Sequence, residues 1–449
     1  RDSSTSRGLG DVYKRQLLKA TVMYSQDGHP ETNFRIVPVS PNAASLGTYG
    51  LIPTDNYVGQ ARISIPIYEI DLDGKKFPIA LSYHTDGTRV AQEATWIGLG
   101  WTLQAGGCVV RQVQGTDDFA ARGCYNLTDA PWLTNPRFEV TDQNLEKYMG
   151  YFKGDYDAEP DMFYFNAGGH SGSMYFDVLK NNRQLNAVPT IQTQEKVVKM
   201  VYNTSNKTWT MTDLEGYVYS FSTKEITYYF LNTIDFFQTD ITRSHIFPYY
   251  NEPQIVTAWM LDSVTSPNGG KITFSYKKES IFTPISTTED VISLSKIVNG
   301  QLSSQSPQYF TNKFNYNYSY SKIEQWTLSA ITFEGGKVEF GTTDREDIES
   351  AETGKKVQKL SSIKVSDTAG NLIKTTMLEY KYLLSGMAAT TNGYDDRLLL
   401  SKVYDVAGSK KNNVYTMDYN MGKLPPKRSL SVDCLLYTSP SPRDVEESR

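Results

Sequence analysis

Residues 61–83 read ARISIPIYEIDLDGKKFPIALSY, and this stretch decides the fold class. Apolar residues occupy alternate positions over 63–67 and again over 79–83, and the turn-forming sequence Asp-Leu-Asp-Gly at 71–74 lies between the two runs. Because side chains two positions apart on a strand share a face, each run presents one apolar face. Two such runs around an Asp-Gly turn predict an antiparallel hairpin that packs on a core.

A glycine-rich stretch, WIGLGWTLQAGGCVVR, follows at residues 96–111. Glycines on both sides of Leu99, and a glycine pair at 106–107, are typical of sharp bends or of a close approach between backbones. Trp96 and Trp101 add large apolar rings. We therefore predict a structural corner. A dinucleotide-binding loop is the alternative, but Gly98-x-Gly100 lacks the third glycine and the following helix.

Further strand–turn–strand patterns occupy the middle of the chain. Residues 161–177 place two runs with aromatic residues around a glycine-rich turn, and residues 209–221 do the same around Glu215-Gly216. The run at 314–320 alternates Phe or Tyr with Asn or Ser, as in a strand with one aromatic face. Residues 115–160 are irregular and polar, and we expect the one short helix of the chain at Gln143–Tyr151.

A degenerate repeat organises the C-terminal half. Each unit begins with Leu-x-x-Val/Ile, passes through a glycine turn and ends in a strand that closes on Tyr or Phe. Recurring units of this kind predict stacked hairpins that bury their faces on one another. The three-residue spacing departs from a strand's period of two, and a β-bulge is one arrangement that accommodates it. The units begin at Leu261, Leu328, Leu360 and Leu400.

These patterns predict an all-β fold of antiparallel hairpins stacked into extended, curved sheets, shell-like or sandwich-like, with very little helix. We divide the chain into three regions. Residues 17–115 form an N-terminal hairpin region with the GLGW motif, residues 116–255 a middle β region with an irregular insert, and residues 256–433 the region of degenerate repeated hairpins.

Short motifs follow one another in a fixed order along most of the chain, from about Pro41 to Pro426. In this order they resemble the N-terminal region of Rhs/YD-repeat proteins of the Bacteroidetes type. The GLGW group is also similar to the start of insecticidal toxin-complex B-components, which form a shell. The motifs are PNAASLGTYG at 41–50, GQARISIPIY at 59–68, LSYH at 81–84, GLGWTL at 98–103, EPDMF at 159–163, WML at 259–261 and SPNG at 266–269.

The resemblance implies a segment of a large bacterial β-rich protein that is secreted or displayed on the outer cell surface. Some members of this family enclose a toxic C-terminal segment in a hollow shell. A run of true YD repeats and a variable toxin tip are not recognisable up to Asp433. The resemblance implies that they lie beyond it, as the partner of this segment within the same chain.

Three hypotheses for function remain open. The first is a non-enzymatic β scaffold, such as a part of a toxin-delivery shell. The second is an adhesin or carbohydrate-binding module that binds a cell-surface or glycan partner through exposed Tyr and Trp. The third is an enzyme with an unrecognised pair of carboxylates. Aromatic rings buried between sheets favour the scaffold, and rings arrayed on an outer face favour the binding module. The sequence singles out no catalytic, cofactor-binding or metal-binding residue.

Acidic residues offer two weak calcium patterns. Asp71, Asp73 and Gly74 resemble the start of a calcium loop, but no Glu follows at the required spacing, and a hairpin turn is the better interpretation. Residues 155–161 carry a carboxylate at every second position, which supplies the oxygen ligands that Ca²⁺ prefers. Here we favour a solvated acidic loop over a metal site. The carboxylates belong to Asp155, Asp157, Glu159 and Asp161.

Nucleophilic and metal-binding groups are few. The His170-Ser171 pair invites a hydrolase interpretation, but adjacent strand residues face opposite ways, and no nucleophile elbow surrounds the serine. The remaining histidines are widely scattered, and two free thiols, at Cys108 and Cys124, are favoured over a disulfide. Other groups without a strong signal are His29, His84, His245 and the glycosylation-like Asn126, Asn203, Asn206 and Asn317.

Net charge and hydropathy exclude two classes of protein. The formal net charge is −5, so the basic excess of a nucleic-acid-binding protein is absent. The sequence contains no run of 18 apolar residues, and so no candidate transmembrane helix.

Both ends of the chain resemble translated sequencing adapter. Residues 6–16 can be encoded by a DNA sequence whose reverse complement, in a shifted frame, encodes residues 434–444. We therefore expect 1–16 and 434–449, which include Cys434, to be non-native, and we expect the native segment to run from about Leu17 to Asp433, open at both ends. Natural Ser/Pro-rich tails are the alternative, and these would be disordered.

Overall fold

Alternating burial along the strands builds a protein that is almost entirely β, as the sequence predicts. The computed structural model describes residues 37–51, 63–83, 92–115, 117–120, 123–124, 157, 159–177, 188–192, 198–234, 246–248, 254–293, 297–298, 301–302, 312–384, 394–421 and 427.

A small sheet contains the hairpin that the sequence predicts at residues 61–83. Its strands are β1 (Ile63–Leu72), β2 (Lys75–Tyr83) and β3 (Trp101–Gln104), paired in that order. Ile65, Ile70 and Leu81 point into the core, and Asp71 accepts a hydrogen bond from the Gly74 amide in the turn. The predicted hairpin at 61–83 is thus confirmed over the residues that the structure describes.

The remaining described strands, apart from the short pair β15 (Ile297–Val298) and β16 (Gln301–Leu302), form one large antiparallel sheet. They are β4 (Gly107–Gln112), β5 (Met162–Ala167), β6 (His170–Tyr175), β7 (Thr190–Ile191), β8 (Val198–Asn203), β9 (Thr208–Asp213), β10 (Val218–Ile234), β11 (Phe247–Pro248), β12 (Ile255–Thr265), β13 (Lys271–Phe282), β14 (Ser286–Ser293), β17 (Asn312–Phe333), β18 (Gly336–Asp344), β19 (Glu349–Ser350), β20 (Gln358–Ser366), β21 (Leu372–Leu383), β22 (Arg397–Ala407) and β23 (Lys410–Thr416).

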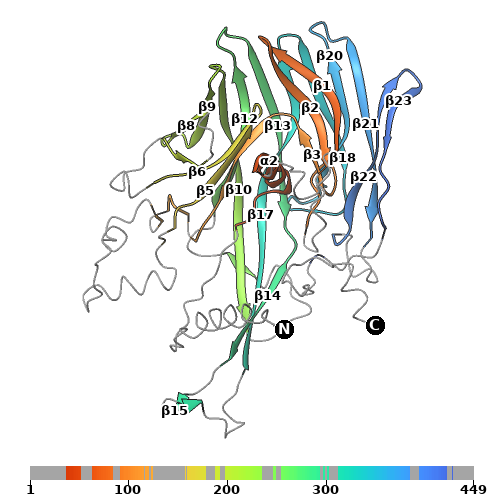
Figure 1. Cartoon of the computed structure of the whole chain (residues 1–449). Coiled ribbons are helices and arrows are strands. Elements are labelled where there is room, and N and C mark those ends of the chain that lie inside the picture. The colour runs from red at the N-terminus through yellow and green to blue at the C-terminus, as the bar shows by residue number, and fades with distance from the viewer. Residues whose placement is uncertain are drawn as a thin grey trace, which may run out of the picture.

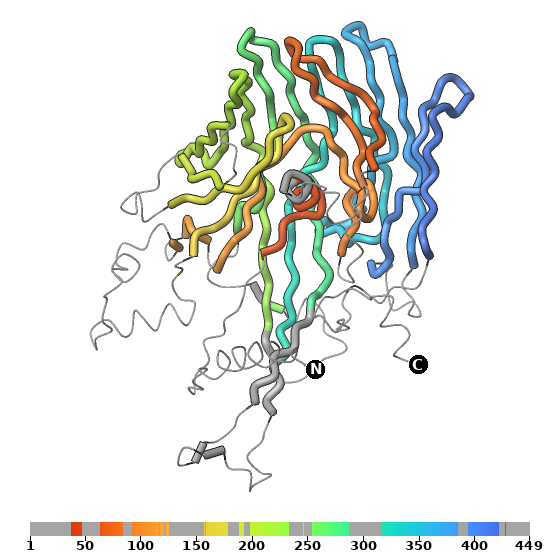
Figure 2. Tube along the Cα trace, in the orientation of Figure 1, coloured from red at the N-terminus to blue at the C-terminus, as the bar shows by residue number. Residues whose placement is uncertain are grey.

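The small sheet lies against the large sheet, and the main core fills the space between them (Figure 1). In Figure 2 the orange hairpin of β1 and β2 lies over the cyan and blue strands of the C-terminal half. Lys374 of β21 donates to the carbonyl oxygen of Ile67 across this contact, at 2.9 Å. Two packed sheets with an apolar interior correspond to the sandwich-like form of the predicted fold class.

Four strands of the large sheet close a ring of pairings. β10 pairs with β12 over its first part and with β17 over its second part, while β13 pairs with both β12 and β17. β12 pairs with β13 only from Ser263 to Thr265. The part of β12 that precedes Ser263 pairs along the same edge with β4 instead. Helix α2 (Pro41–Leu51) lies where β12 and β13 separate (Figure 1).

Helix α2 is an element that the sequence analysis misses. Ser40 caps it, because its hydroxyl accepts a hydrogen bond from the Ala43 amide, and Pro41 occupies the first helical position. Ala43 is buried against Cys108 and Met260. The helix expected at Gln143–Tyr151 lies outside the described residues.

Candidate functional site

The four repeat units share one local irregularity, and it explains their spacing. Their Leu-x-x-Val/Ile segments lie on β12, β17, β20 and β22. On β20, Ser362 pairs with Gly341 and Leu360 pairs with Thr342, so the register passes over Ser361. The same β-bulge falls on the second residue of every unit, and it confirms the arrangement suggested by the sequence. The bulged residues are Asp262, Ser329, Ser361 and Ser401.

The bulge lets both apolar residues of a unit enter the core. Without it, residues three apart on a strand would face opposite sides of the sheet. Instead, Leu360 and Ile363 are both fully buried, and Leu400 and Val403 are at most 1% exposed. Two of the bulged serines also bond across the sheet, since Ser329 Oγ donates to the Ser275 carbonyl and Ser361 Oγ to the Gly341 carbonyl.

A tyrosine hydroxyl closes three of the four units. Tyr276 donates to the carbonyl oxygen of Leu261 at 2.6 Å, Tyr380 to that of Leu360 at 2.6 Å, and Tyr419 to that of Leu400 at 2.8 Å. Each tyrosine thus returns to the leucine with which its own unit begins. Burial raises the pKa of all three phenols, that of Tyr419 to about 12, so they remain donors at neutral pH. The second unit ends in Phe340, which has no hydroxyl.

The GLGW corner forms backbone hydrogen bonds with the third and fourth repeat units. The Leu99 amide donates to the Leu398 carbonyl at 2.8 Å, and the Leu360 amide donates to the Trp96 carbonyl at 3.0 Å. Gly98 has a φ of 121°, and a Cβ on it would lie 2.9 Å from the Leu400 amide nitrogen. The predicted structural corner is therefore a close backbone contact between 96–101 and the third and fourth units.

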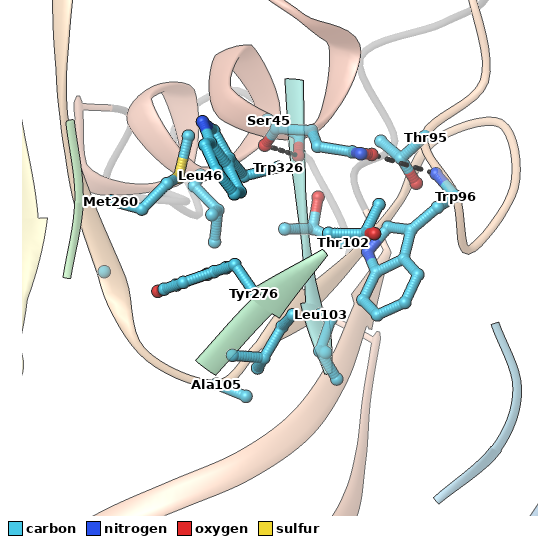
Figure 3. A pocket seen from close by; sticks show the side chains of 14 residues that line it. Ser45, Leu46, Thr95, Trp96, Thr102, Leu103, Ala105, Met260, Tyr276 and Trp326 are labelled. Carbon is cyan, nitrogen blue, oxygen red and sulfur yellow. Dashed lines mark hydrogen bonds between the residues drawn. The ribbon is translucent and has the colours of Figure 1, made fainter. Parts of the chain in front are cut away.

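One cavity lies between α2, the GLGW corner and β17 (Figure 3). Its volume is about 40 Å³, and its lining combines Thr102, Leu103, Tyr276 and Trp326 with the start of α2. At its edge Asn42 accepts a hydrogen bond from the Trp96 amide at 2.9 Å. Ligand pockets for metabolites enclose about 300 Å³ or more. This cavity has room for one or two water molecules and not for such a ligand.

A buried ionic cluster joins the GLGW segment to the C-terminal half. Arg345 donates twice to Asp347, at 2.8 and 2.7 Å, and also donates to the carbonyl oxygens of Ala94 and Thr95. Lys427 reaches the Asp347 carbonyl at 3.0 Å and lies 3.6 Å from Glu93. Two cations and two carboxylates thus pin distant segments together. Sequence reasoning missed this cluster, because its members are scattered charges without a motif.

The acidic run at 155–161 includes a carboxylate that pairs with a buried arginine. Asp161 is fully buried and accepts two hydrogen bonds from Arg111, which also contacts Asp117. Asp157 is buried as well, while Glu159 is exposed and Asp155 lies outside the described residues. The expected solvated loop is therefore wrong for Asp157 and Asp161, which are both buried. Asp161 balances the charge of the Arg111 guanidinium inside the core.

Within this cluster one carboxyl is not satisfied. Asp118 is fully buried, and its Oδ1 has no hydrogen-bond partner, whereas its Oδ2 accepts from the Asp161 amide at 2.7 Å. Burial and the neighbouring Asp161 carboxylate raise the pKa of Asp118 to about 9. Among the described residues, no group of His, Cys, Asp and Glu side chains has an arrangement that holds a metal ion.

His170 belongs to a contact between hairpin tips. Asp213 binds Lys75 at 2.6 Å and Tyr219 at 3.0 Å, and His170 Nε2 lies 3.7 Å from the same oxygen. Burial and the nearby Lys75 lower the pKa of His170, so it is neutral at pH 7. The carboxylate next to this histidine is thus engaged in holding β2 to the turn between β9 and β10. Ser171 follows His170 on β6, opposite Asn166.

The other candidate residues lie apart from one another. Cys108 and Cys124 are both buried, and they are not joined by a disulfide. Asn203 accepts hydrogen bonds from the amides of Ser205 and Asn206 in the exposed β8–β9 turn. No described helix has the length and hydrophobicity to cross a membrane. Outside the described residues lie His29, His84, His245, Asn126, Cys434 and both predicted adapter segments.

Aromatic side chains gather in the interior of the protein. Trp209 is surrounded by Phe163, Phe176, Tyr202 and Trp259, with ring centroids 4.8 to 6.1 Å away. All five side chains are at most 2% exposed. Of the large hydrophobic side chains that are exposed among the described residues, only Tyr415 is aromatic.

No protein-family model matches the chain, and no curated protein matches it. Among solved structures, the N-terminal domain of the effector protein SpvB from Salmonella typhimurium strain LT2 is 11% identical, with a TM-score of 0.34 over 77% of this chain and 98% of that domain. The toxin complex TcdB2-TccC3 is 10% identical, with a TM-score of 0.34 over 88% of this chain. The Photorhabdus luminescens Tc holotoxin pore is 10% identical, with a TM-score of 0.35 over 80%.

The chain spans only 17% and 15% of these two toxin chains. These three structures are thus two toxin-complex chains and an effector domain. Similarity at these identities and TM-scores carries no conclusion about function.

Proposed function

We propose that this chain is a non-enzymatic β scaffold, a shell segment of a secreted or surface-displayed Rhs/YD-repeat-type protein. One observation carries the proposal: a single unit, Leu-x-x-Val/Ile with its bulge, recurs on four strands of one sheet. Its residues bind to backbone and to one another, and the small cavity beneath α2 is lined by only two of them, Tyr276 and Leu328. A repeated element with this internal chemistry serves to build surface, as in other stacked-repeat proteins.

The distribution of aromatic rings supports the scaffold over the adhesin. A carbohydrate-binding surface needs aromatic faces toward solvent. Here the rings around Trp209 are buried between the strands of β5, β8, β9 and β12, where they contribute core packing. An enzyme needs a pocket with convergent polar groups, and the cavity beneath α2 is too small for a substrate.

The motif resemblance supplies the finer part of the proposal. In this view the chain is bacterial and lies outside the cell, and it is followed by further repeats and a variable segment that the shell encloses. The Bacteroidetes type, the adapter origin of the ends and the three-region division at 17–115, 116–255 and 256–433 belong to the same proposal.

The proposal is tested by sequencing genomic DNA outward from the codons of Leu17 and Asp433. The scaffold function predicts that the reading frame continues into tandem strand–turn–strand units and a variable C-terminal segment. A frame that instead joins a catalytic or sugar-binding domain would overturn it. Binding to a glycan array by the purified chain, lost on substitution of the exposed Tyr415, would favour the adhesin.

A further inference from the structure

Glu225 is a fully buried carboxyl on β10, directly beneath the start of α2. Its Oε1 accepts hydrogen bonds from the Ser40 amide at 2.7 Å and from the Thr257 hydroxyl at 3.1 Å. Its Oε2 has no hydrogen-bond partner. We call Ser40, Ala43, Cys108, Glu225 and Thr257 the α2 seat. Nothing in the repeat units or the scaffold role requires a carboxyl at this position.

Among the residues that the structure describes, the groups that face Glu225 carry no positive charge. The segment before α2 contributes Ser40, β12 contributes Thr257, and β4 contributes Cys108, of which only the thiol titrates. Tyr276 of β13 faces Cys108 in turn. Burial raises the pKa of Glu225, and burial together with Glu225 raises that of Cys108. A lone carboxylate in such a place is much less stable than the neutral acid.

Glu225 holds the beginning of α2 on the sheet. Ser40, whose amide it binds, is also the residue that caps the helix. A neighbouring bond from Thr227 to the Pro38 carbonyl, at 3.0 Å, fixes the chain just before it. Under the helix, Cys108 Sγ lies 4.0 Å from the Ala43 carbonyl oxygen and is fully buried. Departure of α2 would therefore uncover this thiol.

We propose that the closed α2 seat holds Glu225 as a neutral acid and that its ionisation releases α2 from the sheet, which makes the α2 seat a pH-sensitive latch. Because the closed state binds the proton more tightly than the open state, closure is strongest below the ordinary pKa of glutamate. It weakens as pH rises toward the raised pKa of the folded state. Across that interval the open population grows up to about tenfold per pH unit, since one proton leaves per opening.

The experiment measures alkylation of Cys108 by iodoacetamide in the full chain as a function of pH, with the labelled peptide quantified by mass spectrometry. Wild type is compared with Glu225→Gln at each pH. The ratio of the two rates cancels the pH dependence that the two thiols share. The charge of Glu225 would raise the pKa of Cys108 and so lower the ratio, which means that a rise in the ratio reports opening. We expect this ratio to rise with pH for Cys108 and to stay flat for Cys124, which is buried elsewhere. A flat ratio for Cys108 would overturn the latch.

A second variant covers the case in which Glu225→Gln does not fold. Thr257→Val removes one hydrogen bond that lowers the pKa of Glu225 but keeps the carboxyl. Labelling of Cys108 should be faster than in wild type. The labelling rate should also stop rising at a higher pH than in wild type. Faster labelling with an unmoved pH profile would mean that the seat is only a packing contact, and the proposal would fail.

Discussion

Asp347 is a buried carboxylate, and both of its oxygens accept hydrogen bonds from Arg345. Asp347→Asn would leave the guanidinium buried without its counter-charge, which costs about 3–5 kcal/mol. We expect a loss of that size in the free energy of unfolding, measured by urea denaturation. Lys337→Met is the control, since it breaks an exposed pair with Glu339 and should cost at most about 1 kcal/mol. Equal losses in the two variants would contradict the structural role of the buried cluster.

Asp118 makes stability depend on alkaline pH. Its pKa rises from 3.8 to about 9 on folding, so the folded state gains stability from the bound proton. That gain is complete below the ordinary value and is lost as pH rises toward 9. We expect urea titrations between about pH 7 and pH 9 to show a smaller loss of stability in Asp118→Asn than in wild type.

The control for this titration is Asp367→Asn. Asp367 is only partly buried, and hydrogen bonds from Asn371 lower its pKa, so its contribution changes only in acid and the alkaline slope should match wild type. If Asp118→Asn also keeps the wild-type slope, another group accounts for the alkaline sensitivity.

At the scale of the strand, the bulge on β20 can be removed without turning any side chain over. Deletion of Ser361 joins Leu360 and Ser362, which pair with the adjacent residues Thr342 and Gly341. The strand then becomes regular, and Leu360 and Ile363 both remain inside. We expect a folded protein whose calorimetric transition is only modestly lower.

Deletion of Lys364 on the same strand is the matched control. It lies between Ile363 and Val365, both fully buried, and no bulge precedes Val365 in its pairing with β18. The deletion shifts the register by one and turns Val365 outward, which loses about 1.5–3 kcal/mol for that side chain alone. In calorimetry, the melting temperature of this deletion variant should be well below that of the Ser361 deletion. The reverse order would show that the bulge itself carries the stability.

β23 is the strand most prone to association. All seven of its residues are exposed, and among the described strands it pairs only with β22. Val414 and Tyr415 give this edge apolar side chains, although lysines precede them. Unprotected edges pair with other chains, so we expect concentration-dependent association in light scattering. Val414→Lys should reduce it, whereas Leu214→Lys, in the distant β9–β10 turn, should not. A monomer at all concentrations would refute this prediction.

Local hairpins could be predicted from sequence, and distant contacts could not. The Asp-Gly turn at 71–74 and the glycine turns of the four units carry their own signals, because alternation and turn residues are neighbours in the chain. The pairing of β4 with β12, and the meeting of Arg345 with Ala94, join residues far apart in sequence. Glu225 and Asp118 gave no signal either, since only the fold reveals that a carboxyl is buried. Of the acidic patterns, the hairpin turn at Asp71 is confirmed, whereas the solvated loop is wrong for Asp157 and Asp161.

At the scale of the whole molecule, most of the buried apolar residues that the structure describes belong to one core. Residues from the N-terminal hairpin, the middle strands and the repeat units all belong to the same buried cluster. We therefore expect a single cooperative thermal transition, in which tryptophan fluorescence and far-ultraviolet circular dichroism coincide. Two separate transitions would show that the three proposed regions are independent folding units.

The bulges in β12, β17, β20 and β22 occupy equivalent positions in their units, so each of these strands is expected to bend at the same point of its unit. A bulge bends its strand and increases the local right-handed twist. Strands lie about 4.8 Å apart, so each additional two-stranded unit would extend the curved sheet by about 10 Å while turning it further the same way. Every unit would then contribute the same curvature, and the number of units would determine how much volume the curved sheet encloses.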